Sequence, residues 1–187
     1  MNTLVVEVKL LEAMEFSANR HRFQRRKDEH ATPYINHPIQ VAYTCAAAGE
    51  SDLDLLMAAL LHDTIEDTET TYEELCDRFG SLVADLVIEL TDDKLLSAEE
   101  RKIKQVASAS QKSEKARKIK LADKICNVND MLNHPPHEWS IQRRFEYIEW
   151  SKQVVDQMKG TQSVLENRFR ELYRQALEKF PHHEFTR

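Results

Sequence analysis

The chain of 187 residues is poor in glycine and proline, with three and five copies respectively. Their scarcity argues against long irregular loops and sheet-rich folds. No stretch approaches the ~20 consecutive apolar residues of a membrane span. Basic residues are outnumbered, since 26 Lys and Arg face 32 Asp and Glu for a net charge of -6. This balance argues against a general nucleic-acid binder, and it permits a local basic patch for a small anionic ligand.

Cysteine is also sparse. Cys45, Cys76 and Cys126 are odd in number, widely spaced and without a CxxC pair, which supports neither a disulfide framework nor a zinc knuckle. We therefore expect three reduced, partly buried thiols in a cytoplasmic protein. The opening run "MNTLVVEVKLLEAMEF" is too short and too acidic in its apolar part for a signal peptide.

What the chain has in abundance is helical periodicity. The pattern predicts a helix ending near Arg20, a loop over 21–36, and helices over about 38–48, 52–67, 114–132, 140–158 and 161–179. Three capping boxes mark helix starts: "SDLD" with Ser51 as N-cap, "TYEE" from Thr71 and "SAEE" from Ser97. No alternating strand pattern, repeat or linker is convincing. The expected fold is all-α, a compact single-domain globule of eight to ten helices.

The run "ALLHDTIEDT", residues 59–68, places one histidine and three carboxylates beside an apolar stretch. On a helix over 55–67, His62 and Glu66 would be i,i+4 neighbours, as would Asp63 and Asp67. All four would then share one side near the helix C-terminus. Such an acidic group attracts a cation, which a helix C-terminus also favours.

Two other residues are candidates to complete a metal site. His37, in "YINHPI", stands at a helix start, and Asp123, in "LADK", interrupts an apolar helix face, where a carboxylate needs a partner. With His62 and Asp63 they form a set of two nitrogens and two oxygens. That set suits an octahedral first-row ion, such as Mn²⁺ or Fe²⁺, with positions open for water and substrate.

Each of these residues also has an ordinary structural interpretation. A histidine beside proline is usually a helix-start residue, and an aspartate near lysine usually forms a surface ion pair. The remaining histidines are expected in solvent, and these include His21, His30, His134, His137, His182 and His183. The conjunction of H…HD…D with Glu66 and Asp67 one turn on is much harder to obtain by accident.

This conjunction resembles the HD-domain phosphohydrolase superfamily. The segments "RRKDEHATPYINHPIQVA", "AALLHDTIEDT", "FGSLVADLVIELTDDK" and "KIKLADKICNVNDM" resemble the hydrolase domain of the RelA/SpoT proteins, and above all its small stand-alone form, the metazoan SpoT-homologue type. The resemblance covers about residues 5–178. It implies one HD-type hydrolase domain over residues 1–187, with no room for a synthetase domain.

The resemblance implies removal of the 3′-pyrophosphate from guanosine tetra- or pentaphosphate, the alarmones (p)ppGpp of the stringent response, with one Mn²⁺ per chain. Its metal ligands would be His37, His62, Asp63 and Asp123. Glu66 and Asp67 would activate and steer the attacking water. A carboxylate one turn from the ligands is well placed for general base chemistry.

A polyanionic substrate requires local positive charge on a protein of net charge -6. The run "RHRFQRRK", residues 20–27, would alone more often be a solvated face or a localisation signal. The resemblance makes it a nucleotide-binding loop, with Arg26 flanking the base and Lys27 meeting phosphate. Tyr34 and Asn127 would bound the nucleoside. Lys124 and Arg143 are further candidates for phosphate contact.

Two departures from the family pattern bear on substrate affinity. Cys126 and Asn129 stand where relatives often have a large residue and an arginine, and "LLSAEE" follows "TDDK" where relatives tend to have a basic residue. Two alternatives therefore stay open: hydrolysis of another nucleotide phosphate, such as the 2′-phosphate of NADPH, or a non-catalytic nucleotide-binding module. Intact Glu66 and Asp67 argue against the second. The partner expected is a small nucleotide, with no nucleic acid and no membrane, and the sequence does not set the oligomeric state.

Overall fold

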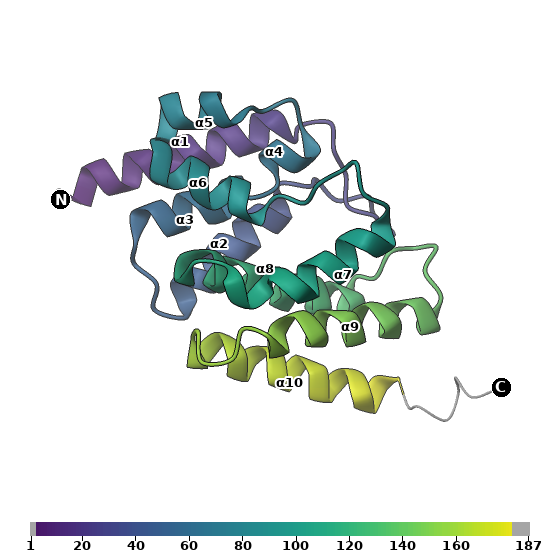
Figure 1. Cartoon of the computed structure of the whole chain (residues 1–187). Coiled ribbons are helices and arrows are strands. Elements are labelled where there is room, and N and C mark those ends of the chain that lie inside the picture. The colour runs from purple at the N-terminus through teal and green to yellow at the C-terminus, as the bar shows by residue number, and fades with distance from the viewer. Residues whose placement is uncertain (1–2, 181–187) are drawn as a thin grey trace.

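The computed structural model describes residues 3–180, and within that span the chain is all-α, as expected (Figure 1). It has ten α-helices, a number within the expected eight to ten, and one 3-10 helix, η1. Their bounds are α1 Thr3–Arg20, α2 Asn36–Ala47, α3 Leu53–Leu61, α4 Thr64–Asp67, α5 Tyr72–Phe79, α6 Ser81–Leu90, α7 Ala98–Ser108, η1 Ala109–Gln111, α8 Glu114–Asn133, α9 Ile141–Asp156 and α10 Ser163–Lys179. No described helix is long and apolar enough to cross a membrane.

Side-chain caps fix several helix starts. Ser97 forms a full capping box on α7, which confirms that prediction, whereas at α5 the structure shows only the N-cap half of the predicted box, the Thr71 side chain accepting from the Glu74 amide. The prediction of Ser51 as the cap of α3 was wrong by one residue. Asp52 has the extended backbone of an N-cap, and its carboxylate accepts a hydrogen bond from the Leu55 amide at 2.9 Å.

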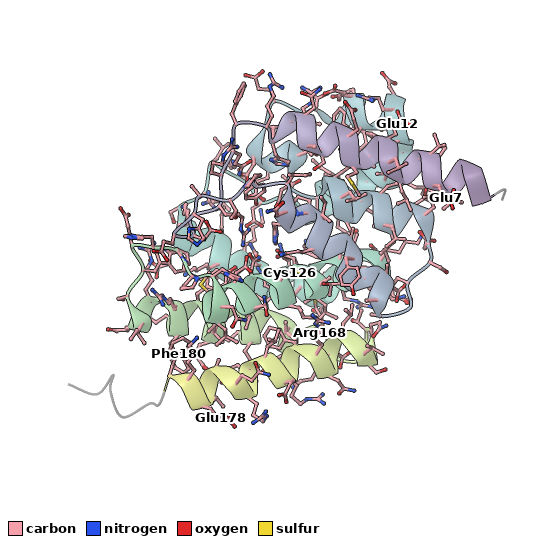
Figure 2. All side chains as sticks on the ribbon, turned by 180° about the vertical axis from the view of Figure 1, so that it is seen from behind. Glu7, Glu12, Cys126, Arg168, Glu178 and Phe180 are labelled. Carbon is pink, nitrogen blue, oxygen red and sulfur yellow. The ribbon has the colours of Figure 1, made fainter. Side chains whose placement is uncertain are left out.

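The helix α8 is buried on two faces, because it belongs to two hydrophobic clusters. Ile119 and Ala122 pack into a cluster with α1, α2, α3, α5 and α6, whereas Leu121, Ile125 and Val128 pack into a second cluster with α9 and α10. Figure 2 shows α1 and α10 on opposite sides of the molecule. Burying both faces of α8 places the polar residues of its middle turns inside the protein.

All three cysteines are free, as expected. Cys45 and Cys126 are buried, and burial raises the pKa of each of these two thiols to about 12. Cys76 on α5 is half-buried.

Candidate active site

The predicted single helix over 55–67 is divided in two at His62 and Asp63, so that prediction was wrong. The helix α3 ends at Leu61, and the single turn α4 begins at Thr64. Side chains satisfy the last carbonyls of α3: the Thr64 hydroxyl donates to Leu61 O at 2.7 Å, and His62 Nδ1 donates to Ala59 O at 2.9 Å. These local bonds replace the backbone donors that a continuing helix would supply.

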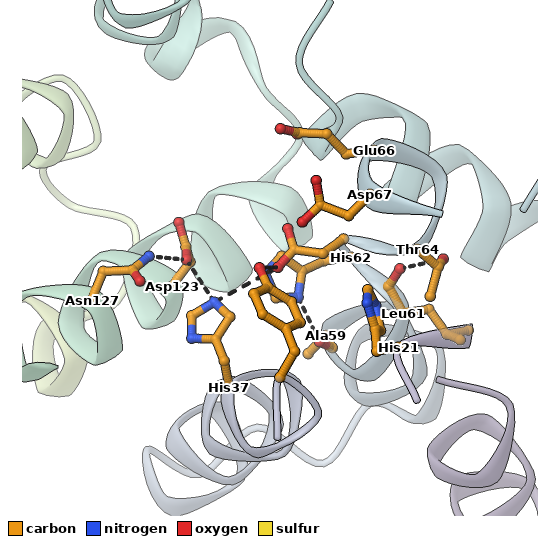
Figure 3. A network of polar contacts seen from close by, with 12 residues as sticks. His21, His37, Ala59, Leu61, His62, Thr64, Glu66, Asp67, Asp123 and Asn127 are labelled. Carbon is orange, nitrogen blue, oxygen red and sulfur yellow. Dashed lines mark hydrogen bonds and ion pairs between the residues drawn. The ribbon is translucent and has the colours of Figure 1, made fainter. Parts of the chain in front are cut away.

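The break brings four predicted ligands together. His37 Nε2, from α2, lies 3.2 Å from Asp123 Oδ1 of α8 and 3.8 Å from Asp63 Oδ2. His62 Nε2 lies 3.1 Å from the same Asp63 oxygen. Figure 3 shows how His37, His62 and Asp123 converge from three helical segments. The side chains of adjacent residues on one continuous helix point about 100° apart. The turn at 62–63 therefore allows His62 and Asp63 to point toward the same site.

The donor set fits a divalent metal ion. The ligand atoms of His37, His62 and Asp123 lie within 4.8 Å of one another, and all three residues are buried. His62 donates through Nδ1, so Nε2 is the ring atom that a metal ion would bind, and this buried atom has no hydrogen-bond partner among the described residues. Ligand bonds of about 2.1 Å place neighbouring donor atoms about 3 Å apart, which matches the two shortest spacings in the cluster.

Glu66 and Asp67 lie beside the four ligands rather than among them. Glu66 accepts a hydrogen bond from the Asp92 amide at 3.0 Å. Asp67 accepts from Gln24 and Lys94, each at 2.9 Å. In Figure 3 both carboxylates stand on one side of the cluster, on α4. The predicted division into four ligands and two neighbouring carboxylates is compatible with this geometry, and the catalytic role stays a prediction.

Donors around the cluster hold the ligand carboxylates. The Tyr34 hydroxyl donates to Asp63 Oδ2 at 2.7 Å, and Asn127 Nδ2 donates to Asp123 Oδ1 at 2.5 Å. Lys124 Nζ lies 3.3 Å from the other Asp123 oxygen. These three residues were predicted to contact substrate, and the structure places them against Asp63 and Asp123, two of the predicted metal ligands. Outer-shell contacts of this kind orient ligands and tune their basicity.

A pocket of about 390 Å³ opens beside the cluster. It is lined by five of the predicted site residues, namely Arg26, Lys27, Tyr34, Asp67 and Asn127. Arg26 forms an ion pair with Asp130, and its guanidinium lies 5.7 Å from the centre of the Tyr34 ring. The pocket thus combines cations, aromatic rings and the carboxylates of Asp28, Asp67 and Asp130 next to the candidate metal site.

The sequence matches the HD domain family over residues 13–148, a span that contains all four predicted ligands. The chain belongs to the HD-domain family. It is 48% identical over 165 residues to the zebrafish protein "Guanosine-3′,5′-bis(diphosphate) 3′-pyrophosphohydrolase MESH1", covering 88% of this chain and 92% of that one. The human protein of the same name is 50% identical over 167 residues, covering 89% and 93%.

A solved structure is similar throughout. It is described as a metazoan ortholog of SpoT that hydrolyzes ppGpp and plays a role in starvation responses. The TM-score is 0.87 and the identity 44%, over 89% of this chain and 94% of that chain. The resemblance read from the sequence motifs is therefore confirmed, and we call His37, His62, Asp63 and Asp123 the HD cluster.

Charge in the HD cluster favours cation binding. Burial opposes ionisation of His62, yet without a cation the neighbouring Asp63 outweighs burial and raises the pKa of the imidazole to about 9, so a metal ion would bind Nε2 in place of this proton. Burial also opposes ionisation of Asp123, but Lys124 and His37 hold the pKa of that carboxyl well below its usual range. Burial raises the pKa of Glu66, which has no cation against it among the described residues. The cluster carboxylates are therefore ionised and ready to bind a cation.

Lys124 and Arg143, which were predicted to contact phosphate, do not line the pocket beside the HD cluster. Lys124 is buried, and its ammonium lies 4.2 Å from the centre of the Trp150 ring as well as beside Asp123. Arg143 is exposed and stacks on Trp139 at 4.2 Å, and Trp139 does line the pocket. Arg143 thus stands next to the pocket through this ring. Both roles stay predictions.

The sequence reading missed several residues of the HD site. Gln24, Met131, Trp139 and Tyr147 also line the pocket. Trp139 follows a proline pair and Tyr147 sits within a helix, so neither position carried a local signal of function.

The expectation of solvent for the remaining histidines was wrong for His21, which is 2% exposed because the turn after α1 folds inward. It holds for His30, His134 and His137, which are exposed. His182 and His183 lie outside the described residues.

Proposed function

We propose that this chain is a Mn²⁺-dependent hydrolase that removes the 3′-pyrophosphate from guanosine 3′,5′-bis(diphosphate), (p)ppGpp, to give GDP or GTP and pyrophosphate. The observation that carries the proposal is the HD cluster with Glu66 and Asp67 beside it, adjoining a pocket lined by Arg26 and Lys27. The names of the zebrafish and human relatives support the substrate.

In this proposal the chain's residues divide the work by charge. The HD cluster would hold one Mn²⁺, which when bound supplies Lewis-acid stabilisation of phosphate charge and a more acidic water. Manganese is favoured because the donors are nitrogen and oxygen without thiolate. Glu66 and Asp67 would accept the proton of the attacking water and orient it, since both are close to the cluster and free of its coordination.

The loop before α2 would bind the nucleotide. Arg26 is planar and already lies near the Tyr34 ring, which suits contact with a purine base, whereas Lys27 is exposed and suits phosphate. Arg20 and Arg22, earlier in the same basic run, do not line the pocket beside the HD cluster: Arg20 pairs with Glu74, and Arg22 bonds Asn19. Arg26 and Lys27 are therefore the residues of the run that we assign to substrate.

Tyr34 and Asn127 would serve twice in this proposal. Each holds a ligand carboxylate and each also lines the pocket, so each would meet the nucleoside beside the metal. Lys124 and Arg143 would add positive charge at the margin. The single hydrolase domain, the cytoplasmic location and the absence of nucleic-acid and membrane partners belong to the same proposal.

Purified protein assayed with Mn²⁺ against a panel of ppGpp, NADPH and deoxynucleotides tests the proposal. We expect release of pyrophosphate and GDP from ppGpp, with the highest kcat/KM of the panel. Chelation should abolish turnover and added Mn²⁺ should restore it, with about one ion bound per chain. A higher kcat/KM for NADPH would reassign the substrate, and full activity of the metal-free protein would remove the metal from the proposal.

A further inference from the structure

The carboxylate of Asp67 is held from two sides by parts of the chain distant in sequence. Lys94 Nζ lies 2.9 Å from Oδ1, and Gln24 Nε2 donates to Oδ2 at 2.9 Å. The Lys94 side chain is 53% exposed, so this ion pair is screened by solvent and contributes little to fixing the carboxylate. The hydrogen bond from Gln24 also lies at the surface, but Gln24 is half-buried and its other amide atom contacts the buried His21, so it is the better fixed of the two contacts.

The orientation of the Gln24 amide follows from its two partners. An ionised carboxylate only accepts hydrogen bonds, so Gln24 must present its NH₂ group to Asp67 and its Oε1 to the other side. On that side His21 Nδ1 lies 2.6 Å from Gln24 Oε1. Because an amide oxygen only accepts, Nδ1 must carry the proton. Asp67 thereby dictates both the flip of the amide and the tautomer of the histidine.

The state of His21 agrees with this assignment. Burial lowers the pKa of the imidazole, which keeps the ring neutral. Its Nε2 is buried and has no hydrogen-bond partner among the described residues. In the neutral Nδ1–H tautomer this nitrogen is an acceptor with an unused lone pair. A protonated ring would instead bury an unsatisfied donor on a charged group, which costs more.

The His21–Gln24 pair is anchored to the body of the protein. The His21 amide donates to Ser17 O at 3.0 Å, which continues the end of α1, and the Gln24 amide donates to His21 O at 2.9 Å. The His21 ring also lies 5.0 Å from the ring of Tyr34. Although Gln24 lies in a loop, its backbone is hydrogen-bonded to His21 and its side-chain amide contacts the buried His21 ring. The side-chain amide that donates to Asp67 is therefore held in place.

We propose that Gln24 and His21 act as positioning residues for Asp67, holding its carboxylate in its present orientation. Figure 3 shows Asp67 in this orientation beside the HD cluster. The proposal rests on the proposed function, in which Asp67 steers the attacking water. Gln24 makes the direct contact, and His21 acts only through Gln24. Small errors in the placement of a reacting group cost turnover strongly, so the pair should govern kcat.

Four variants test the pair through steady-state kinetics with ppGpp at saturating Mn²⁺. Gln24→Leu should lower kcat about tenfold or more. His21→Leu should lower kcat to a similar degree without raising KM, since His21 does not line the pocket. The double variant should be no slower than Gln24→Leu alone. His21→Asn should recover most of the loss, because its Nδ2 branches from Cγ as the imidazole Nδ1 does.

A matched control is Gln175→Leu on α10, which removes another Gln-to-carboxylate hydrogen bond, to Glu171 at 3.0 Å, far along the chain. It should leave kcat unchanged. Additive losses in the double variant, wild-type kcat in Gln24→Leu, or no recovery in a folded His21→Asn would each overturn the proposal. Thermal melting of every variant shows which of them are folded.

A measurement that does not depend on activity tests this proposal separately from the proposed function. Long-range ¹H–¹⁵N spectra of the metal-free wild-type protein should show His21 as a single neutral Nδ1–H tautomer between about pH 6 and 8. An Nε2–H tautomer or an imidazolium would overturn the positioning pair whatever the enzyme does. If the wild-type protein leaves ppGpp intact, the proposed function is wrong. The tautomer of His21 then still tests whether Gln24 and His21 hold Asp67 as proposed.

Discussion

Replacing Tyr34 by phenylalanine removes one hydrogen-bond donor to the HD cluster and changes little else. The hydroxyl donates to Asp63 Oδ2 at 2.7 Å, while the ring packs 5.9 Å from His37 and 5.0 Å from His21, contacts that phenylalanine keeps. Burial and the charge of Asp63 raise the pKa of the phenol, so Tyr34 stays a donor at every physiological pH. Tyr34→Phe therefore tests one hydrogen bond to a metal ligand.

The size of the effect follows from two independent scales. A hydrogen bond to a charged group contributes about 1.5–3 kcal/mol, which at about 1.4 kcal/mol per factor of ten corresponds to roughly 10- to 100-fold in affinity. Loss of an outer-shell partner of a ligand typically costs the same range. The Asp63 side chain is 18% exposed and keeps His62 at 3.1 Å, so water replaces part of the lost bond. We expect Mn²⁺ affinity to fall about tenfold.

The assay is competition for Mn²⁺ against a fluorescent chelator at fixed pH, which requires no turnover. Tyr43→Phe is the matched control, since Tyr43 lies on the same helix as His37 and is 68% exposed. It should bind Mn²⁺ as wild type does. An unchanged Mn²⁺ Kd in Tyr34→Phe, together with a raised KM for ppGpp, would refute this reasoning and return Tyr34 to a purely nucleoside-binding role.

Other outcomes follow from the same geometry. Glu66→Gln with Asp67→Asn should lower turnover by about 10²-fold or more even when bound Mn²⁺ is saturating, because amides cannot accept the proton; rescue to wild-type turnover by added metal would contradict this. Arg26→Ala should raise KM for ppGpp much more than Arg20→Ala while leaving bound Mn²⁺ unchanged, and equal small effects would mean a diffuse field. In the native protein at pH 8 a thiol reagent should titrate Cys76 alone, because a thiol of pKa about 12 is ionised in only about one copy in 10⁴; three equally fast thiols would show that the two buried cysteines are accessible.

The sequence by itself determined the fold class and the chemistry of the cluster. Helical periodicity and the scarcity of glycine and proline depend on near neighbours, and they predicted helices that the structure reproduces, such as α8 at Glu114–Asn133. The ligand types were equally legible, because His62, Asp63 and Asp123 stand out from apolar surroundings where unpaired polar groups are costly. The HD-domain family that these motifs resemble matches the chain over residues 13–148.

Tertiary structure alone decided which partner each polar side chain meets. Local pattern predicted a continuous helix through His62, but side-chain bonds to Ala59 and Leu61 carbonyls end α3 there. The same holds for His21, whose expected solvent exposure gave way to burial beside Gln24. Contacts such as Tyr34 with Asp63 join residues 29 positions apart. Periodicity encodes which face of a helix is buried, whereas such contacts depend on how the helices pack, and that is set by the two hydrophobic clusters around α8.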